Sequence, residues 1–217
     1  MTSKEIKFLR KQVASFMRRL YSRGLTTASG GNISFHTGEE ILITPSAIDK
    51  AVVRGRHIGI MDPEGKNLTP ELKLSIESAM HAAIYKVRPD VKAIVHAHPP
   101  VATSFTAMKQ PINCSLIAEA RAVLGQPALA PYALMGTTGL AEITAQTASE
   151  FNPLPNVILL QNHGIVCLGK DLLTAFDRME VLEAAARMTV LTSVMGSVNQ
   201  LSTEQMAAID AMMNSAN

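Results

Sequence analysis

The sequence of 217 residues lacks the features that mark several common classes of protein. No apolar run reaches membrane-spanning length, and the first residues lack the apolar core of a secretory signal, so we expect a cytoplasmic protein without a membrane partner. The formal net charge is only +2, which gives no electrostatic reason to expect nucleic acid as a partner. No linker, low-complexity tract or internal repeat divides the chain, and residues 1–217 are therefore interpreted as one domain.

Cysteine is also scarce in this sequence. The two cysteines, Cys114 and Cys167, form no closely spaced motif and lie within apolar stretches. This pattern indicates buried thiols in a reducing cytoplasm and argues against a disulfide. The rest of the composition, with 47% hydrophobic and 18% charged residues, is that of a globular protein with one sizeable core.

Apolar residues at helical spacing predict several helices. Residues 4–23 are predicted to form an amphipathic first helix with a basic, solvated face, and residues 70–88 a second helix that Pro70 opens. Asp171 is placed to cap a long helix, and Ser202 to cap a final one.

Two apolar stretches predict strands. Residues 91–98, "VKAIVHAH", predict a strand that ends at two prolines, and residues 156–169, "NVILLQNHGIVCLG", predict a hairpin. Strands that are gathered between helices indicate a three-layer α/β or α+β domain.

The end of the first of these strands carries a candidate metal site. His96 and His98 are two residues apart, so their side chains point to the same face of a strand. One histidine in such a place is usually a satisfied core or surface residue, whereas two imidazoles on one face favour a metal.

Further candidate ligands stand elsewhere in the chain. Glu77 borders the apolar face of its predicted helix, where a carboxylate is either a surface charge or a ligand, and His81 follows it by one helical turn as an alternative ligand. His163 lies at the predicted hairpin turn, where it is either a turn residue or a ligand. Three imidazoles with one carboxylate suit Zn²⁺, and Mn²⁺, Fe²⁺ or Co²⁺ could occupy the same set.

A second group of segments suggests anion binding. The stretches "SGGN" (29–32) and "TPS" (44–46), with Ser75 before the Glu77 position, supply backbone N–H groups and hydroxyls of the kind that hold phosphate. None of these segments is specific by itself, since "SGGN" alone is simply a turn.

Taken together, these motifs resemble the class II aldolase/adducin head-domain family. The resemblance covers about residues 5–195 and rests on "TTASGGNIS", "ILITPSAIDK", "SIESAMHAAIYKVRPDVKAIVHAHP", "LAPYALMGT" and "LLQNHGIVCLG", in that order. It implies a three-layer α/β/α sandwich around a mainly antiparallel sheet. It also implies a homotetramer with active sites between neighbouring subunits.

The resemblance implies roles for particular residues. The metal ligands would be His96, His98, His163 and Glu77, and Glu77 would also be catalytic, in preference to His81. The phosphate-binding positions would be Gly31, Asn32, Ser46, Ala47, Ser75 and Ile76.

The implied activity is that of a metal-dependent aldolase. It would cleave a ketose 1-phosphate, either fuculose 1-phosphate or a 5-deoxypentulose 1-phosphate, to dihydroxyacetone phosphate and an aldehyde. A methylthioribulose-1-phosphate dehydratase is the first alternative, followed by a pentulose-phosphate 4-epimerase and a decarboxylase of a keto acid phosphate. An adducin-like scaffold without activity is disfavoured, because all four ligand positions hold side chains able to bind metal.

The sequence also departs from the family pattern. Ala47 and Ile76 stand where the family's aldolases have glycine and serine, so the phosphate site has one hydroxyl fewer. The family's proton-handling tyrosine has no match near residues 113–116, "NCSL". Glu119 is the substitute that we predict as a second catalytic residue, and its alternative is a solvated charge on a short helix.

Overall fold

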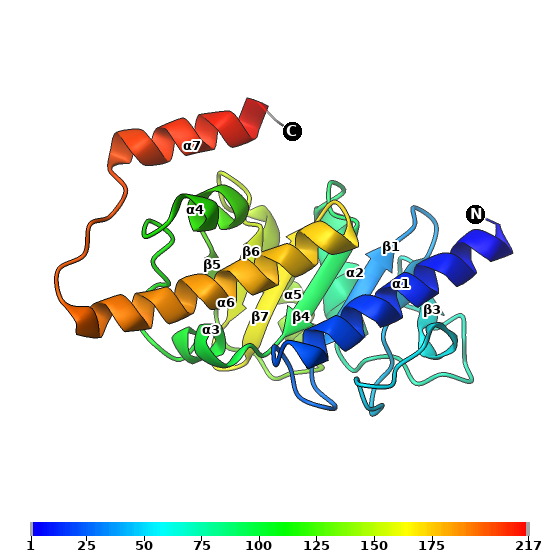
Figure 1. Ribbon diagram of the computed structural model, residues 1–217. Coiled ribbons are helices and arrows are strands. Elements are labelled where there is room, and N and C mark those ends of the chain that lie inside the picture. Colours follow the sequence, from blue (N-terminus) through cyan, green and yellow to red (C-terminus); the bar gives the residue numbers. More distant parts are fainter. Residues whose placement is uncertain (1, 216–217) are drawn as a thin grey trace.

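A seven-stranded sheet forms the middle layer of the computed structural model, which describes residues 2–215 (Figure 1). The strands are β1 (Asn32–His36), β2 (Ile41–Ile43), β3 (Gly59–Met61), β4 (Ala93–Ala97), β5 (Ala128–Ala130), β6 (Val157–Leu160) and β7 (Gly164–Gly169). Their order is β3-β2-β1-β4-β7-β6-β5. All neighbours pair antiparallel except β5 and β6, which run parallel.

Helices cover both faces of this sheet. They are α1 (Ser3–Ser22), the 3₁₀ helix η1 (Gly55–His57), α2 (Ser78–Val87), α3 (Pro100–Phe105), α4 (Ala118–Leu124), α5 (Thr138–Ser149), α6 (Leu172–Met195) and α7 (Thr203–Ser215). One core lies between the sheet and α1, α3, α4 and α6, and a second lies between the sheet and α2 and α5. The predicted three-layer fold with a mainly antiparallel sheet is confirmed.

Strand β4, in the centre of the sheet, divides its side chains between the two cores. Val95 belongs to the core under α6, while Ile94 belongs to the core under α2. Because strand residues alternate between faces, His96 shares the face of Ile94 and points toward α2. The predicted strand at 91–98 is therefore confirmed, and its two-residue period sets the side on which the site is built.

The other local predictions are largely confirmed. Strands β6 and β7 form the predicted hairpin. Asp171 caps α6, because its carboxylate accepts from Thr174 N at 2.7 Å. Ser202 and Gln205 exchange hydrogen bonds at the start of α7. No helix among residues 2–215 is long and apolar enough to cross a membrane.

The predicted start of the helix at Pro70 is wrong, since α2 begins only at Ser78. Leu74 forms an isolated β-bridge with Pro45 and packs closely on Gly59, where a β-carbon would lie 2.1 Å from its Cδ2. These contacts hold residues 73–75 out of a helix and beside residues 44–46. The consequence is that Glu77 occupies the N-cap position of α2 and not its second turn.

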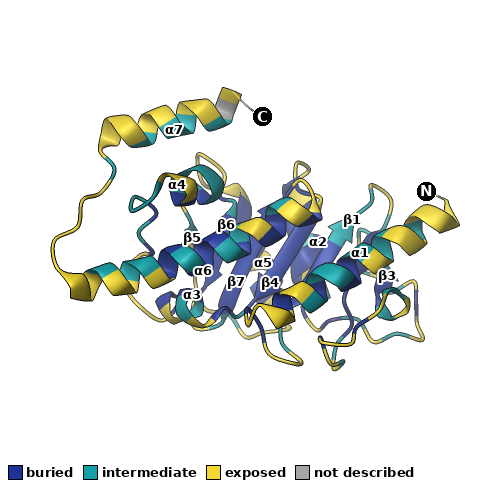
Figure 2. Cartoon of the chain, in the orientation of Figure 1, coloured by how far each residue is buried: buried dark blue, intermediate teal, exposed yellow. Residues whose placement is uncertain are grey.

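Figure 2 shows how burial changes along α6. Its first half is largely buried on the sheet, whereas Val190, Leu191, Val194 and Met195 near its end are exposed. Helix α7 follows an extended segment and is mostly exposed in the same view. The C-terminal end of α6 therefore extends an apolar surface beyond the sheet.

A buried arginine joins α2 to the elements beside it. Arg88 is 3% exposed, and its Nη1 donates to Ala148 O at 3.2 Å and to Pro155 O at 2.8 Å. We expect Arg88→Met to lower the free energy of unfolding by about 2–4 kcal/mol, because two buried carbonyls lose a charged donor. Urea denaturation measures this, with Asp90→Asn as the control. A loss no larger than that of Asp90→Asn would contradict the assignment.

Candidate metal centre and substrate site

Four predicted ligands meet at one end of the sheet. The ligand nitrogens of His96, His98 and His163 lie within 4.8 Å of one another. Glu77, at the start of α2, faces the same point: its Oε2 is 3.1 Å from His96 Nε2 and its Oε1 is 3.1 Å from His163 Nε2. The structure thus brings residues from a helix start, a strand end and a hairpin turn into one cluster.

The orientation of these groups fits a metal ion. His96 Nδ1 donates to Ile165 O at 2.9 Å, so the proton of a neutral ring is on Nδ1 and the Nε2 lone pair faces the carboxylate. His96 Nε2 and Glu77 Oε1 are buried without a hydrogen-bond partner. Lone pairs 3.1 Å apart repel unless a cation lies near both, and ligands of a tetrahedral zinc with ~2.0–2.1 Å bonds are ~3.3 Å apart.

Glycines permit this close packing of rings. A β-carbon on Gly164 would lie 2.5 Å from His98 Cδ2 and 3.2 Å from His96 Cε1. Gly30 stands in a similar relation to His98, where a β-carbon would lie 3.2 Å from Nδ1. A side chain at the position after His163 would therefore clash with the imidazoles, so the glycine of "QNHG" is required there.

Burial and neighbouring charge set the protonation of the cluster. Burial by itself raises the pKa of Glu77. In the metal-free cluster, the positive charge of a protonated His96 and hydrogen bonds from His163 and Asn32 outweigh burial and hold the pKa well below its ordinary value. Burial, with the charges of His96 and His163, lowers the pKa of His98 to about 4. Near pH 7 the cluster therefore contains an ionised carboxylate and a neutral imidazole, which are the forms that bind metal.

A chain of buried hydrogen bonds leads away from Glu77. Asn32 Nδ2 donates to Glu77 Oε2 at 2.8 Å, and Asn32 Oδ1 lies 2.5 Å from His81 Nε2. His81 Nδ1 is 2.6 Å from Ser34 Oγ, which is 2.7 Å from Tyr85 Oη. The Glu77 carboxylate only accepts, so the Asn32 amide nitrogen faces it and the Asn32 oxygen accepts from His81 Nε2–H. His81 Nδ1 then accepts from Ser34 Oγ, and Ser34 Oγ accepts from the Tyr85 hydroxyl.

This chain explains what His81 does in the structure. Both of its ring nitrogens are engaged, with Asn32 and Ser34, so neither is free to be a metal ligand. Burial, with positive charge at His96, lowers the pKa of His81 to about 3, and the ring is neutral as the chain requires. His81 fixes Asn32, and Asn32 in turn fixes one oxygen of Glu77.

Ser34 and Tyr85 were not among the predicted site residues, although their spacing carries a signal. Glu77, His81 and Tyr85 are four residues apart and share one face around the first turns of α2. Asn32 and Ser34 are two apart and share one face of β1. Spacing shows that the residues of each set share one face, but only the fold shows that the two faces lie opposite each other.

The three predicted anion-binding segments also lie side by side. Ile33 O accepts from Thr44 N at 3.0 Å, and Ser46 N donates to Lys73 O at 3.0 Å. Ser75 Oγ accepts from Glu77 N at 3.3 Å, which joins this group to the metal ligands. Asn32 is also tied to the metal ligands: one Nδ2 donor is engaged by Glu77 and Oδ1 by His81, which leaves the second Nδ2 donor and the backbone for an anion.

Backbone conformation marks two of these positions. Gly31 has φ of 65°, and a β-carbon there would lie 2.8 Å from His96 O. Ala47, also left-handed with φ of 52°, is exposed and stands where glycine would be unstrained. Ile76 is 52% exposed beside the site and supplies an apolar surface where a hydroxyl was expected from the family pattern.

Glu119 does not join the cluster within one chain. It is exposed in the first turn of α4, and its carboxylate makes no hydrogen bond or ion pair to any residue in the range 2–215. Ala120 and Leu124 of α4 belong to the core under α6, whereas Glu77 lies on the α2 side of the sheet. The sheet therefore separates the two predicted catalytic glutamates.

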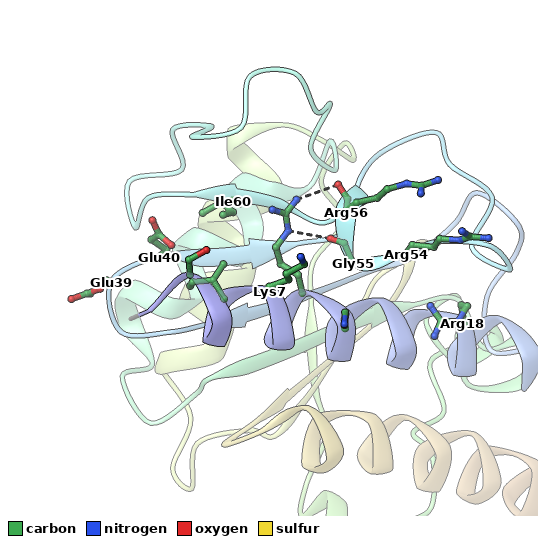
Figure 3. Close-up of a pocket in the computed structure, with 12 residues that line it drawn as sticks. Lys7, Arg18, Glu39, Glu40, Arg54, Gly55, Arg56 and Ile60 are labelled. Atoms are coloured by element: carbon green, nitrogen blue, oxygen red, sulfur yellow. Dashed lines mark hydrogen bonds between the residues drawn. The ribbon is translucent and has the colours of Figure 1, made fainter.

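A hollow of about 980 Å³ lies away from the histidine cluster, between α1 and the segment before β3 (Figure 3). Basic side chains dominate it, among them Lys7, Arg18, Arg54 and Arg56. Arg10 in the same wall donates to Gly55 O at 3.1 Å and so ties η1 to α1. None of the predicted site residues lines this hollow.

Comparison with known proteins identifies the family. Residues 11–190 match the family described as "Class II Aldolase and Adducin N-terminal domain". The chain belongs to this family, as its motifs predict, and its predicted class, a class II aldehyde-lyase, is confirmed.

Particular relatives share most of the chain. An L-fuculose phosphate aldolase of Methanocaldococcus jannaschii is 35% identical over 84% of this chain and 96% of that relative. A 5-deoxy-D-ribulose 1-phosphate aldolase of Bacillus thuringiensis serovar kurstaki is 28% identical over 91% of each chain. A solved L-fuculose 1-phosphate aldolase superposes with a TM-score of 0.85 at 30% identity and covers 99% of this chain and 98% of its own.

The metal centre can be tested by elemental analysis. We expect His96→Ala or His98→Ala to abolish binding of a transition metal, because the remaining ligands no longer complete a four-ligand set. His57→Ala, which changes a half-buried histidine outside the cluster, is the matched control. Full metal content in the His96→Ala protein would disprove the ligand assignment.

The hydrogen bonds that link Glu77 to Asn32 and His81 give a separate prediction. We expect His81→Phe to weaken metal affinity by about 10- to 100-fold while the protein stays folded, because Asn32 loses the donor that orients it. His81→Gln, which can both donate and accept, should recover part of the affinity. Competition with a chelating dye measures the affinity and circular dichroism the fold. Wild-type affinity in His81→Phe would show that Asn32 orients Glu77 without help.

Proposed function

We propose that the protein cleaves a ketose 1-phosphate to dihydroxyacetone phosphate and an aldehyde. The observation that carries the proposal is a cluster of three imidazoles and a carboxylate joined directly to the predicted anion-binding segments. Ser75 Oγ accepts from the backbone N of Glu77, so a phosphate and a reacting carbon would be held by one continuous segment. The relatives named as aldolases support the same reaction type.

Glu77, His96, His98 and His163 would hold the metal. Zn²⁺ suits three nitrogens and one carboxylate oxygen, and Mn²⁺, Co²⁺ or Fe²⁺ are the alternatives. The bound metal supplies a Lewis acid that polarises the C2 carbonyl of the substrate. His96 contributes through its Nε2, since its Nδ1 is engaged by Ile165 O.

The substrate phosphate would lie among the neutral donors of the three loops. Ser46 and Ser75 supply hydroxyls, and Gly31 brings the backbone close because it has no β-carbon. Ala47 and Ile76 complete the loops without adding a hydroxyl. This arrangement would place C1 at the phosphate loops, with C2 and C3 toward the histidine cluster.

Two proton transfers accompany cleavage of the C3–C4 bond. A base removes the proton of the C4 hydroxyl, the bond breaks, and C4 becomes the carbonyl carbon of the aldehyde. The electron pair remains with the three-carbon fragment. Glu77, released from the metal when the substrate binds and protonated by solvent, would deliver that proton to C3 to complete dihydroxyacetone phosphate and return to its ionised form. Asn32 holds one Glu77 oxygen in place at 2.8 Å during this exchange.

Glu119 is the proposed base for the C4 hydroxyl, and it would come from a neighbouring subunit. The sheet separates it from Glu77 in the same chain, so this role requires the proposed homotetramer with shared active sites. Exposed apolar side chains border the cluster and suit such contact: Tyr132, Leu134 and Met135 follow β5. Tyr132 N donates to Gln161 Oε1 at 3.1 Å, two residues from His163.

The cytoplasm is the proposed compartment. Both cysteines are buried and free, which suits a reducing environment. The substrate is proposed to be 5-deoxyribulose 1-phosphate or fuculose 1-phosphate, since exposed apolar residues near the cluster, Leu134 and Met135, favour a weakly polar aldehyde part.

The reaction is tested by incubating the metal-loaded protein with each of these two sugar phosphates. We expect release of dihydroxyacetone phosphate, measured with a coupled NADH-consuming reductase, and loss of the signal after chelation. Glu77→Gln should slow turnover by ~10²–10⁴-fold, since it removes a proton-transfer group. Glu142→Gln, on α5, is the matched control.

Other products would identify other activities. A diketone phosphate with an unchanged number of carbons would make dehydration the reaction, and carbon dioxide release from a keto acid phosphate would indicate decarboxylation. Glu119→Gln should slow cleavage if that residue acts as the base. An unchanged rate in Glu119→Gln would leave it as a surface charge.

A further inference from the structure

Lys50 is a buried cation without an acidic partner. It is 1% exposed, and its Nζ donates to Pro45 O at 2.8 Å. No carboxylate of the part of the chain that the structure describes forms an ion pair with it; the neighbouring Asp49 is exposed and accepts from Ala51 N instead. Lysine is almost never fully buried unless its charge is paired, because removing an ammonium from water costs several kcal/mol.

The position of Lys50 links it to the proposed phosphate group. Its backbone N donates to Ala28 O at 2.8 Å, next to the 29–32 loop, while its side chain reaches the 44–46 loop at Pro45. Pro45 in turn forms a bridge with Leu74, beside Ser75. One residue therefore contacts the 44–46 segment directly, binds the residue that precedes the 29–32 segment, and lies one bridge away from the third.

Charge is what these segments otherwise lack. The stretches 29–32 and 44–46, with Ser75, contain no charged residue and offer only amides and hydroxyls. Lys73, whose carbonyl accepts from Ser46, is exposed. Burial lowers the pKa of Lys50 to about 8, so most of its ammonium groups stay charged near pH 7. An ammonium has three N–H donors, and within residues 2–215 only Pro45 O accepts from Lys50 Nζ.

We propose that Lys50 supplies the counter-charge for a phosphate monoester bound by the 29–32 and 44–46 loops and Ser75. This inference rests on the proposed function for the location of the phosphate. The dianion would accept from Nζ and would compensate the charge that the protein leaves unpaired. Lys50 is then a binding residue for the phosphate and takes no part in bond cleavage.

A purely structural role gives a different expectation. If Lys50 only supports Pro45, its removal would change the stability of the loop and leave anion affinity nearly unchanged. Methionine is close in length to lysine, and exchanging a buried charge for an apolar group of similar volume is often neutral for stability. Lys50→Met therefore separates the two roles in a protein that is expected to fold.

The experiment measures binding of glycerol 3-phosphate, a phosphate monoester without a carbonyl, to the metal-loaded protein by calorimetry. We expect Lys50→Met and Lys50→Gln to bind it about 10- to 100-fold more weakly, as loss of a charged hydrogen bond predicts. Lys73→Met, which removes an exposed lysine beside the same loop, should bind within twofold of wild type. With the sugar phosphate, Lys50→Met should raise KM much more than it lowers kcat.

The outcomes distinguish this inference from the proposed function. Equal affinity of wild type and both Lys50 variants for glycerol 3-phosphate would overturn the role of Lys50, whatever the activity. Both Lys50 variants could bind glycerol 3-phosphate more weakly while the wild-type protein fails to cleave ketose 1-phosphates. That result would support the phosphate site and reject the aldolase reaction. An equal loss of affinity in Lys73→Met and Lys50→Met would show that the effect comes from the total charge of the surface, and it would overturn the inference.

Discussion

The antiparallel pairing of β1 with β4 is the constraint on which the rest of the site depends. Its register sets Asn32 directly opposite His96. A shift of one residue would turn Asn32 and Ser34 away from α2, because successive strand residues face opposite sides. Gly31 makes the close approach possible beside the His96 carbonyl. The same pairing therefore delivers the glycine loop, a candidate metal ligand and the residue that orients Glu77.

Much of this arrangement could be predicted because it is local. The two-residue period of "VKAIVHAH" gives the strand and the shared face of His96 and His98, and the "QNHG" turn follows from an apolar hairpin pattern. Glu77 and His163 are remote in sequence, and spacing alone left surface and turn roles open for them. Resemblance to a family, and then the fold, brings them to the same point.

The features that escaped prediction depend on contacts between distant segments. Pro70 has the sequence of a helix start, yet Leu74 is held extended by Pro45 and Gly59, and α2 begins later. Lys50 lies in a loop, where a lysine is normally solvated, and its burial depends on contacts with Ala28 and Pro45. In the same way, the sequence around Glu119 does not reveal which layer its helix joins.

The bond between Ser75 and Glu77 has a consequence for which sugars the site can accept. Glu77 lies where the chain enters α2, with φ of −101° and ψ of 15°, and its amide is held by the Ser75 hydroxyl. The proposed phosphate contact and the proposed proton carrier are thus two residues apart on a short, fixed segment. The fold therefore fixes the distance between the phosphate contact and the Glu77 carboxyl group. A ketose phosphorylated at its other end would present a different carbon to Glu77.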